Sequence, residues 1–264
     1  PTRKQDMTRR HAFAVILFAA AALATRAQAA PTNAVMPDVV GSFTTPFSCC
    51  QPRVTNIRRA AQLLDGTVIP PNGRFSMNAT LGPRTREKGF VPAPMISDGR
   101  LVDSVGGGIS QIATTLYNAA FFAGLRLIAH TPHSFYISRY PMGREATISW
   151  GGPELVFANN WPTPLRMHLA ASARSISVRF SSKRLGRRIE SWTGRPYAFR
   201  QPSTRVVHNP GLAPGLRRVV QNAGPPGFTI EYGRRVYRHE RLLSNERWRV
   251  IYQPEDEVIE VGTR

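Results

Sequence analysis

The chain has few cysteines, few lysines and no long apolar run. Only two of its 264 residues are cysteines, and they are adjacent, Cys49 and Cys50. A disulfide framework in an exported protein needs several spaced cysteines, and a zinc site needs ligands at regular spacing. We therefore expect no disulfide scaffold and no metal site, and no motif indicates a cofactor.

The longest apolar stretch covers residues 12–24, which is shorter than the ~18–20 residues of a membrane-spanning helix. It follows the basic start at residues 7–10 and precedes Ala27 and Ala29, two small residues at the positions that a signal peptidase reads. This pattern is typical of a secretory signal peptide over residues 1–29, and a short uncleaved membrane anchor is the alternative. We expect an exported protein of the cell envelope or the extracellular space.

Acidic residues are scarce: 16 oppose 35 basic residues, which gives a net charge of +19. Only three of the basic residues are lysines, and genome composition is an alternative cause of the arginine excess. Residues 1–29 hold five basic groups and one acidic group, so the mature chain would carry +15. Such a charge concentrates anionic polymers around a protein. Because an exported protein seldom meets nucleic acid, we expect peptidoglycan, anionic wall polymer or an anionic membrane surface as partners, and no nucleic acid.

The remaining composition predicts an α+β fold. Hydrophobic residues make up 42% of the chain, enough for a core, and 21 glycines with 22 prolines indicate many turns. Apolar residues at helical spacing predict two main helices, over residues 53–64 and 109–123, among several β-hairpins. We expect a signal peptide at 1–29, an α+β domain at 30–182, a basic Pro-rich linker at 183–215 and a small all-β module at 216–264.

A glycine-rich helix start is the sharpest local feature. Gly106, Gly107 and Gly108 follow a predicted strand and lead into the second helix, whose first turn holds Ser110 and Gln111. The first N–H groups of a helix lack internal partners and can bind an anion or a developing oxyanion. Ser110 is therefore a candidate nucleophile for acyl transfer. The alternative is a plain glycine-rich entry in which Ser110 or a neighbouring group caps the helix.

Histidine is the expected general base. His133 is the first choice and His130 the second, because both follow the strand that returns the chain towards the helix start. A structural loop histidine is the alternative for both residues. We expect structural roles for the remaining histidines of the mature chain, His168, His208 and His239.

The segment after these histidines carries charged and aromatic residues. Arg139 and Arg144 flank Tyr140, and Glu145 follows directly. Arginine binds carboxylates through a bidentate fork, so we expect this group to contact a carboxylate-bearing peptide. A solvated loop with surface ion pairs is the alternative.

Several stretches together resemble the VanW family, which was first named from vancomycin-resistance gene clusters. They include Phe43-Thr-Thr, Asn56-Ile-Arg-Arg-Ala-Ala, Gly106-Gly-Gly-Ile-Ser-Gln-Ile-Ala-Thr-Thr-Leu-Tyr-Asn-Ala119, His133-Ser134 and Tyr140-Pro-Met-Gly-Arg-Glu-Ala-Thr147. The resemblance covers residues 41–182. A shorter match, ending at Gly262, resembles the five-glycine wall-associated modules.

The resemblance implies an exported envelope protein that is associated with peptidoglycan and binds stem peptide or wall polymer. Some VanW domains are understood to be L,D-transpeptidases with a cysteine nucleophile at the position of Ser110. The alternative function is thus an L,D-transpeptidase-like acyl transferase in which Ser110 replaces that cysteine. A serine there needs a well-aligned base, since a helix start does not ionise a hydroxyl. For Cys49 and Cys50 three roles remain open: a relocated nucleophile, a vicinal disulfide or a structural pair.

Overall fold

The computed structural model describes residues 38–47, 51–97 and 100–263. The predicted signal peptide and the two cysteines lie outside these residues. The described part holds three helices: α1 (Gln51–Leu64), α2 (Met77–Leu81) and α3 (Ser110–Phe122). Its N-terminal strands are β1 (Asp38–Pro46), β2 (Val68–Ile69), β3 (Arg74–Ser76), β4 (Pro92–Ser97), β5 (Arg100–Val105), β6 (Arg126–Ala129), β7 (Val156–Ala158), β8 (Leu165–Ala171) and β9 (Ser175–Ser182). Its C-terminal strands are β10 (Arg187–Thr193), β11 (Tyr197–Arg200), β12 (Thr204–Asn209), β13 (Arg217–Gln221), β14 (Gly227–Arg238), β15 (Arg241–Tyr252) and β16 (Glu257–Gly262).

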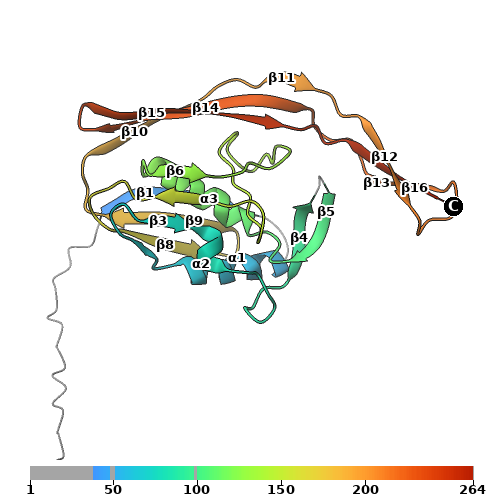
Figure 1. Cartoon of the computed structure of the whole chain (residues 1–264), viewed down its shortest axis with the longest axis horizontal. Coiled ribbons are helices and arrows are strands. Elements are labelled where there is room, and N and C mark those ends of the chain that lie inside the picture. The colour runs from blue at the N-terminus through green and yellow to red at the C-terminus, as the bar shows by residue number, and fades with distance from the viewer. Residues whose placement is uncertain (1–37, 48–50, 98–99, 264) are drawn as a thin grey trace, which may run out of the picture. The chain divides into compact units, whose positions relative to one another are not determined.

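An antiparallel sheet in the order β1–β9–β8–β2 supports the N-terminal part of the fold. Leu165, Met167 and Leu169 of β8 are buried, while the residues between them are partly or fully exposed. Side chains alternate between the two faces of a strand, so one face of this sheet is apolar. α3 packs against β1 and β9, and α1 packs against β8 (Figure 1).

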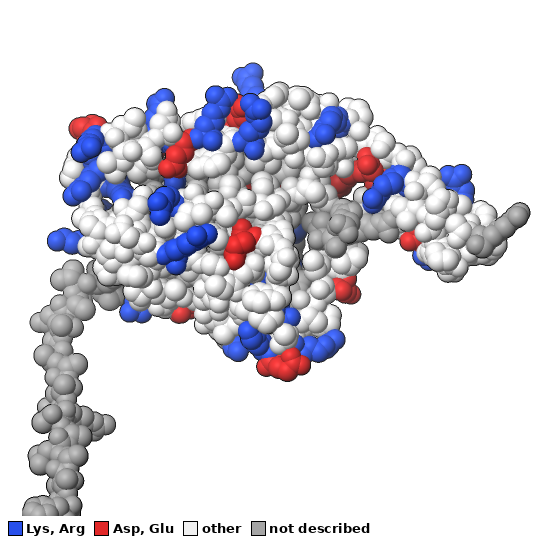
Figure 2. Space-filling model, viewed as in Figure 1, with Lys and Arg blue, Asp and Glu red and all other residues white. Residues whose placement is uncertain are grey.

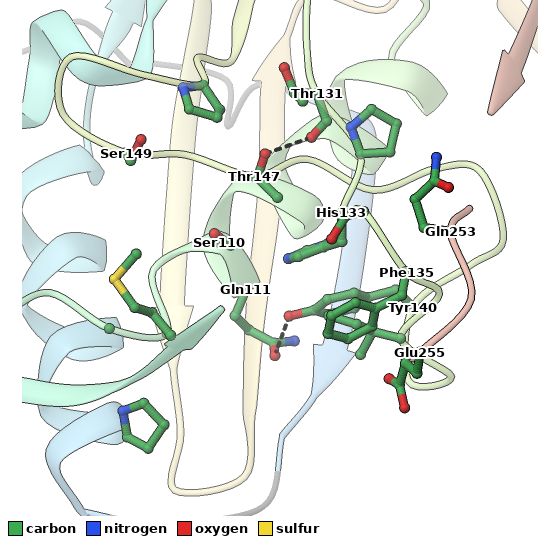
Figure 3. Close-up of a pocket in the computed structure, with 18 of the residues that line it drawn as sticks. Ser110, Gln111, Thr131, His133, Phe135, Tyr140, Thr147, Ser149, Gln253 and Glu255 are labelled. Carbon is green, nitrogen blue, oxygen red and sulfur yellow. Dashed lines mark hydrogen bonds between the residues drawn. The ribbon is translucent and has the colours of Figure 1, made fainter. Parts of the chain in front are cut away.

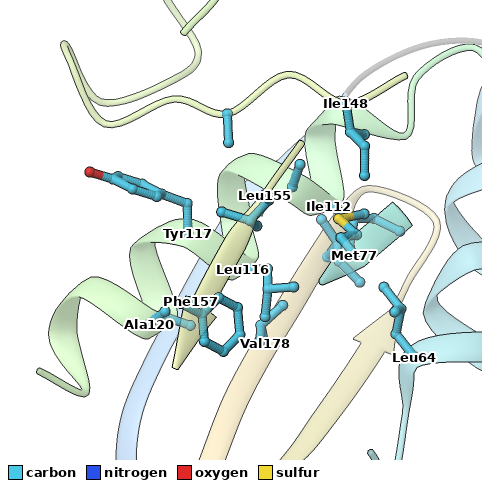
Figure 4. Close-up of a cluster of buried hydrophobic side chains, with 14 of the residues drawn as sticks. Leu64, Met77, Ile112, Leu116, Tyr117, Ala120, Ile148, Leu155, Phe157 and Val178 are labelled. Carbon is cyan, nitrogen blue, oxygen red and sulfur yellow. The ribbon is translucent and has the colours of Figure 1, made fainter. Parts of the chain in front are cut away.

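α3 is the central helix of the core. Eleven of its thirteen residues are buried. Ile112 and Leu116 lie in one apolar cluster with Leu155, Phe157 and Val178 (Figure 4). Burying each such side chain contributes about 1.5–3 kcal/mol, and a helix buried on nearly all sides is a core element. The position of α3 is therefore set by packing along its whole length.

The hairpin β4–β5 leads into α3. Its register runs from Pro92 opposite Val105 to Ser97 opposite Arg100. A second small sheet, in the order β3–β7–β6, follows on from the other end of α3 through β6. The chain thus enters α3 from a hairpin and leaves it into a strand, as the sequence pattern predicts.

β14 and β15 form a long antiparallel ribbon in the C-terminal part, and β10 and β11 pair with β14. On β14, Phe228, Ile230 and Tyr232 are buried and belong to the same apolar cluster as the core around α3. β12, β16 and β13 form a further sheet, in which β12 runs parallel to β16. The expected fold class, α+β with two main helices and a β-rich C-terminal module, is confirmed.

The segment predicted as a linker, residues 183–215, differs from that expectation. It contains β10, β11 and β12, which pair with β14 and β16. All four residues of β11 are exposed, and β10 has no fully buried residue. These strands are held by backbone pairing and not by burial of apolar side chains. Their sequences therefore lack the hydrophobic alternation that indicates a strand.

Candidate functional site

The three glycines before α3 meet strict steric requirements. Gly106 and Gly108 have φ angles of +87° and +89°, where a side chain is strained. A Cβ on Gly107 would lie 2.0 Å from the carbonyl oxygen of Ala93 on β4. The N–H groups of Gly106 and Gly107 donate to Val91 and Ser104, within the base of the hairpin. These two N–H groups are therefore not available to a ligand.

The next three N–H groups remain available. Among the described residues, none accepts a hydrogen bond from the backbone N–H of Gly108, Ile109 or Ser110. All three residues line a cleft of about 950 Å³. Unsatisfied N–H groups at a helix start attract negative charge. The loop thus presents donors for a carboxylate or an oxyanion.

Ser110 is the first residue of α3, and its hydroxyl faces the same cleft. Ile109 occupies the N-cap position, and no side chain caps the helix. The Ser110 hydroxyl instead accepts a hydrogen bond from the backbone N–H of Ile148 at 3.3 Å. Within the described part, no hydrogen bond joins Ser110 to a histidine.

His133 and Glu145 form a buried pair beside this helix start. Nδ1 of His133 lies 2.6 Å from Oε2 of Glu145. Glu145 is fully buried and His133 is 8% exposed. In Figure 3 the imidazole extends from its loop towards the side of the cleft where Ser110 and Gln111 lie. An imidazole held by a buried carboxylate has the arrangement of an oriented general base.

The second oxygen of Glu145 reaches a residue of the C-terminal part. Oε1 accepts a hydrogen bond of 2.8 Å from the hydroxyl of Tyr252, the last residue of β15. From its place in the sequence, Glu145 is expected to contact substrate. The structure buries its carboxylate between His133 and Tyr252, where it orients neighbouring side chains instead.

Gln111 forms part of the cleft floor and holds Tyr140. Its Oε1 accepts hydrogen bonds from Arg53 at 2.6 Å and from the Tyr140 hydroxyl at 3.0 Å. Its Nε2 donates to the hydroxyl of Thr45. Burial raises the pKa of Tyr140, so the hydroxyl stays protonated and donates. The Tyr140 ring stacks on His133 with 5.5 Å between centroids, so Gln111 supports the position of His133 through Tyr140.

The structure separates the two arginines that the sequence analysis groups together. Arg139 is exposed, lines the cleft and lies over the ring of Tyr140. Arg144 donates to Asn118 at 3.0 Å and lies over the rings of Phe121 and Phe122, away from the residues that line the cleft. Of the two, only Arg139 is placed to contact a ligand in the cleft.

The second-choice base, His130, also lies away from the cleft. Its Nε2 is 3.1 Å from the hydroxyl of Tyr232, and its ring stacks on Tyr117. Burial lowers the pKa of His130 to about 4. His168 contacts Ser181 at 2.8 Å, and neither His208 nor His239 lines the cleft.

The cleft has a volume of about 950 Å³, and both parts of the fold line it. The helix start and the loop around His133 form one side. The other side comes from the β-rich module and carries charges of both signs: Arg200, Arg205, Glu255 and Asp256. Figure 3 shows Gln253 and Glu255 of this module beside Phe135 and Tyr140. A ligand in the cleft would therefore meet groups as far apart in the sequence as Ser110 and Glu255.

Two positioning residues are missed by the sequence analysis. Asn56 of α1 donates to the carbonyl oxygens of Val91 and Gly107 and accepts from Val91 N–H, which ties the glycine loop to α1. Arg53, one turn earlier, contacts Gln111. Both are buried polar residues on the apolar side of an amphipathic helix, and that placement is the signal that indicates them.

The described residues contain neither a metal-ligand cluster nor a membrane-spanning helix. Within residues 38–47, 51–97 and 100–263, no three His, Cys, Asp or Glu side chains cluster as metal ligands. No helix in these ranges is both long enough and apolar enough to cross a membrane.

Comparison with known proteins gives a family match for the N-terminal part. Residues 52–181 match the family model described as VanW like protein. Over 127 residues the chain is 42% identical to YoaR of Bacillus subtilis (strain 168), which is described as uncharacterized. This match covers 48% of the chain and 42% of YoaR, so the chain spans less than half the length of that relative.

Two solved G5 domains show weak similarity. The G5 domain of an IgA1 protease is 24% identical, covers 30% of this chain and 88% of its own, and has a TM-score of 0.17. HP0197-G5 is 8% identical, covers 29% of this chain and 95% of its own, and has a TM-score of 0.16. TM-scores this low do not establish a shared fold.

Proposed function

Because residues 52–181 of this chain belong to the VanW family, we propose that the protein is an exported, peptidoglycan-associated envelope protein whose cleft binds stem peptides. The sequence pattern of residues 1–29 supports export. The family resemblance supports the link to peptidoglycan.

The single observation that carries the stem-peptide proposal is the composition of the cleft. The start of α3, with three N–H groups that pair with no described residue, and the exposed Arg139 line it together with Arg200, Arg205, Glu255 and Asp256 of the module. Stem peptides carry both carboxylate and amino groups, so a cleft that holds both hydrogen-bond donors and acidic groups is complementary to them.

A binding measurement tests this proposal. Purified muropeptides are titrated into the mature protein by calorimetry, with Arg139→Ala as the variant. Loss of a charge-assisted hydrogen bond costs about 1.5–3 kcal/mol, so affinity falls about tenfold or more. Arg174→Ala is the matched control, because Arg174 is exposed in the β8–β9 turn and does not line the cleft. Equal affinity of wild type and Arg139→Ala would remove Arg139 from the binding site.

A second candidate function, acyl transfer, is favoured by the His133–Glu145 pair. In this reaction the Ser110 hydroxyl attacks a stem-peptide carbonyl, and its proton passes to Nε2 of His133. The N–H groups at the start of α3 stabilise the oxyanion. The leaving amine takes the proton, and an amine of a second stem, or water, then cleaves the Ser110 ester. Because no hydrogen bond joins Ser110 to His133 within the described residues, that contact must form when substrate binds.

Mass spectrometry of muropeptides after incubation separates the two candidates. Cross-linked dimers or trimmed stems support acyl transfer, whereas binding without turnover supports the binding function alone. If acyl transfer occurs, Ser110→Ala and His133→Ala each remove nearly all turnover, and the double variant loses little more, because nucleophile and base act as a unit.

Two further variants complete this test. Ser110→Cys keeps or raises activity, since a thiol at a helix start is easier to activate. Ser138→Ala is the control, because Ser138 is exposed in the loop after His133 and does not line the cleft. Turnover that survives Ser110→Ala but is lost on alkylation of Cys49 and Cys50 would assign the nucleophile to those thiols.

A further inference from the structure

The hydroxyl of Tyr252 lies in a chain of hydrogen bonds whose direction the structure defines. The backbone N–H of Gly143 donates to the Tyr252 oxygen at 2.9 Å. An N–H has no acceptor role, so the proton of Tyr252 is left to donate to Oε1 of Glu145 at 2.8 Å. Burial, together with the charge of Glu145, raises the pKa of Tyr252, which keeps this hydroxyl protonated.

The same chain determines which nitrogen of His133 carries the proton. Glu145 is fully buried and receives the Tyr252 hydrogen bond as an acceptor. An ionised carboxylate can only accept, so the 2.6 Å contact of Oε2 requires a proton on Nδ1 of His133. In the neutral ring Nε2, the nitrogen remote from Glu145, then keeps its lone pair on the side of the cleft that His133 lines.

We propose that Tyr252 of the β-rich module is a positioning residue, which holds Glu145 as an acceptor and thereby fixes His133 in the Nδ1-protonated tautomer. The role of this tautomer as a base rests on the acyl-transfer candidate above. The tautomer itself does not depend on that candidate, because it follows from the hydrogen bonds that an ionised Glu145 accepts from Tyr252 and His133.

Contacts on either side of Tyr252 fix the position of its ring. The backbone N–H of Gln253 donates to the carbonyl oxygen of Ser134, the residue after His133, at 2.6 Å. Arg200 of β11 donates to the carbonyl oxygen of Tyr252 at 3.0 Å. The ring of Tyr252 packs against Tyr136 and Phe228 in the apolar core. The end of β15 is thus attached both to the loop that carries His133 and to the module.

A matched control for Tyr252 exists on the neighbouring strand. Tyr232 of β14 is equally buried, and its hydroxyl lies 2.6 Å from that of Tyr117 and 3.1 Å from His130. Tyr252→Phe and Tyr232→Phe each remove one buried hydroxyl between the two parts of the fold. Only the first of these hydroxyls contacts Glu145.

Nitrogen NMR of the full chain, labelled with 15N-histidine, tests the proposal without any substrate. In mildly alkaline buffer an ordinary imidazole is neutral, and its protonated and unprotonated nitrogens give well-separated signals. The His133 signals are assigned by their absence from a His133→Gln variant. We expect the Nδ1-protonated tautomer in the wild type and in Tyr232→Phe. In Tyr252→Phe we expect the two signals to move towards each other as the tautomers mix.

Two results would overturn the proposal: a Tyr252→Phe protein with the wild-type tautomer, or a Tyr232→Phe protein whose His133 signals shift as far as those of Tyr252→Phe. Glu145→Gln gives an independent test if Tyr252→Phe folds poorly. Tyr252 then donates to the amide oxygen, so the amide nitrogen faces His133 and donates to Nδ1, which moves the ring proton to Nε2. A proton that remains on Nδ1 in Glu145→Gln contradicts the assignment.

Turnover gives a separate readout where the wild type is active. Tyr252→Phe should then lower kcat about tenfold with little change in KM, since the variant alters the base and not the cleft wall. An unchanged kcat would contradict the role of this tautomer as the base in acyl transfer. A wild type without turnover removes the acyl-transfer candidate but not the assignment of Tyr252, which the nitrogen signals decide.

Discussion

Four polar side chains of α3 are fully buried: Gln111, Thr114, Thr115 and Asn118. Each has a hydrogen-bond partner. Thr114 and Asn118, for example, bind the backbone of the loop at residues 144–146. Buried polar groups without partners cost about 1–3 kcal/mol, so these residues are stable only in this packing. At the residue scale, α3 thereby fixes the loop that carries Glu145.

The pH dependence of stability provides a prediction for His130. Burial lowers its pKa from 6.5 to about 4. Between these values the unfolded chain binds a proton that the folded protein does not, so stability falls as the pH drops from 6.5 to 4. At 1.36 kcal/mol per pKa unit, the free energy of unfolding decreases by about 3 kcal/mol.

Urea unfolding at several pH values measures this effect, with His130→Gln as the control. The amide retains a polar contact to Tyr232 but does not titrate, so the stability difference between wild type and variant should shrink as the pH falls. A constant difference across this range would show that His130 is not responsible. Carboxylates titrate in both proteins, and their contribution cancels in the comparison.

At the element scale, the β14–β15 ribbon caps the C-terminus of α3. Arg234 of β14 is fully buried and donates to the carbonyl oxygens of Phe121 and Leu125. It also forms an ion pair with Glu246 of β15 at 2.6 Å. A cation at a helix C-terminus is stabilised by the unpaired carbonyl groups and the helix dipole. The ribbon thus contacts α3 at its end and, through Tyr252, the loop beside its start.

Arg234→Met should be strongly destabilising. The variant removes the buried hydrogen bonds to Phe121 and Leu125 and leaves the partly exposed Glu246 without its cation. A hydrogen bond to a charged group contributes about 1.5–3 kcal/mol. Chemical unfolding of both proteins measures the change. Arg247→Met is the matched control, because Arg247 pairs with Glu231 at the exposed surface, where a pair contributes about 0–1 kcal/mol. Equal losses in the two variants would contradict the capping role of Arg234.

At the scale of the whole molecule, positive charge dominates. Figure 2 shows arginine and lysine side chains gathered over β10, β14 and β15, with fewer acidic groups between them. Several of these arginines pair with Glu190 or Glu231, while the chain as a whole retains a net charge of +19. A surface of this kind attracts anionic polymers and membranes at long range.

Binding to anionic vesicles should therefore depend on salt. The Debye length shrinks from about 30 Å at 0.01 M to about 8 Å at 0.15 M ionic strength, so we expect affinity to fall several-fold over this range. Co-sedimentation with phosphatidylglycerol vesicles measures it, and phosphatidylcholine vesicles are the neutral control. Affinity that is independent of salt would show that shape, and not charge, governs the contact.

The sequence by itself determined the helix start and the family. Gly106 and Gly108 adopt positive φ angles that favour glycine, and apolar spacing indicates α3 without reference to any partner. The α+β class follows from the same periodicities. The VanW resemblance, drawn from matching stretches between residues 41 and 182, is confirmed over residues 52–181.

Only the tertiary structure decided how the candidate site is completed. Arg139 and Arg144 are five residues apart, yet the turn between them sends one to the cleft and the other into an aromatic cluster. Tyr252 reaches Glu145 across 107 residues of sequence, because β15 packs on the core around α3. β11 has no buried residue and exists through its pairing with β14. Side-chain direction and long-range backbone pairing depend on the folded chain, and local sequence patterns do not encode them.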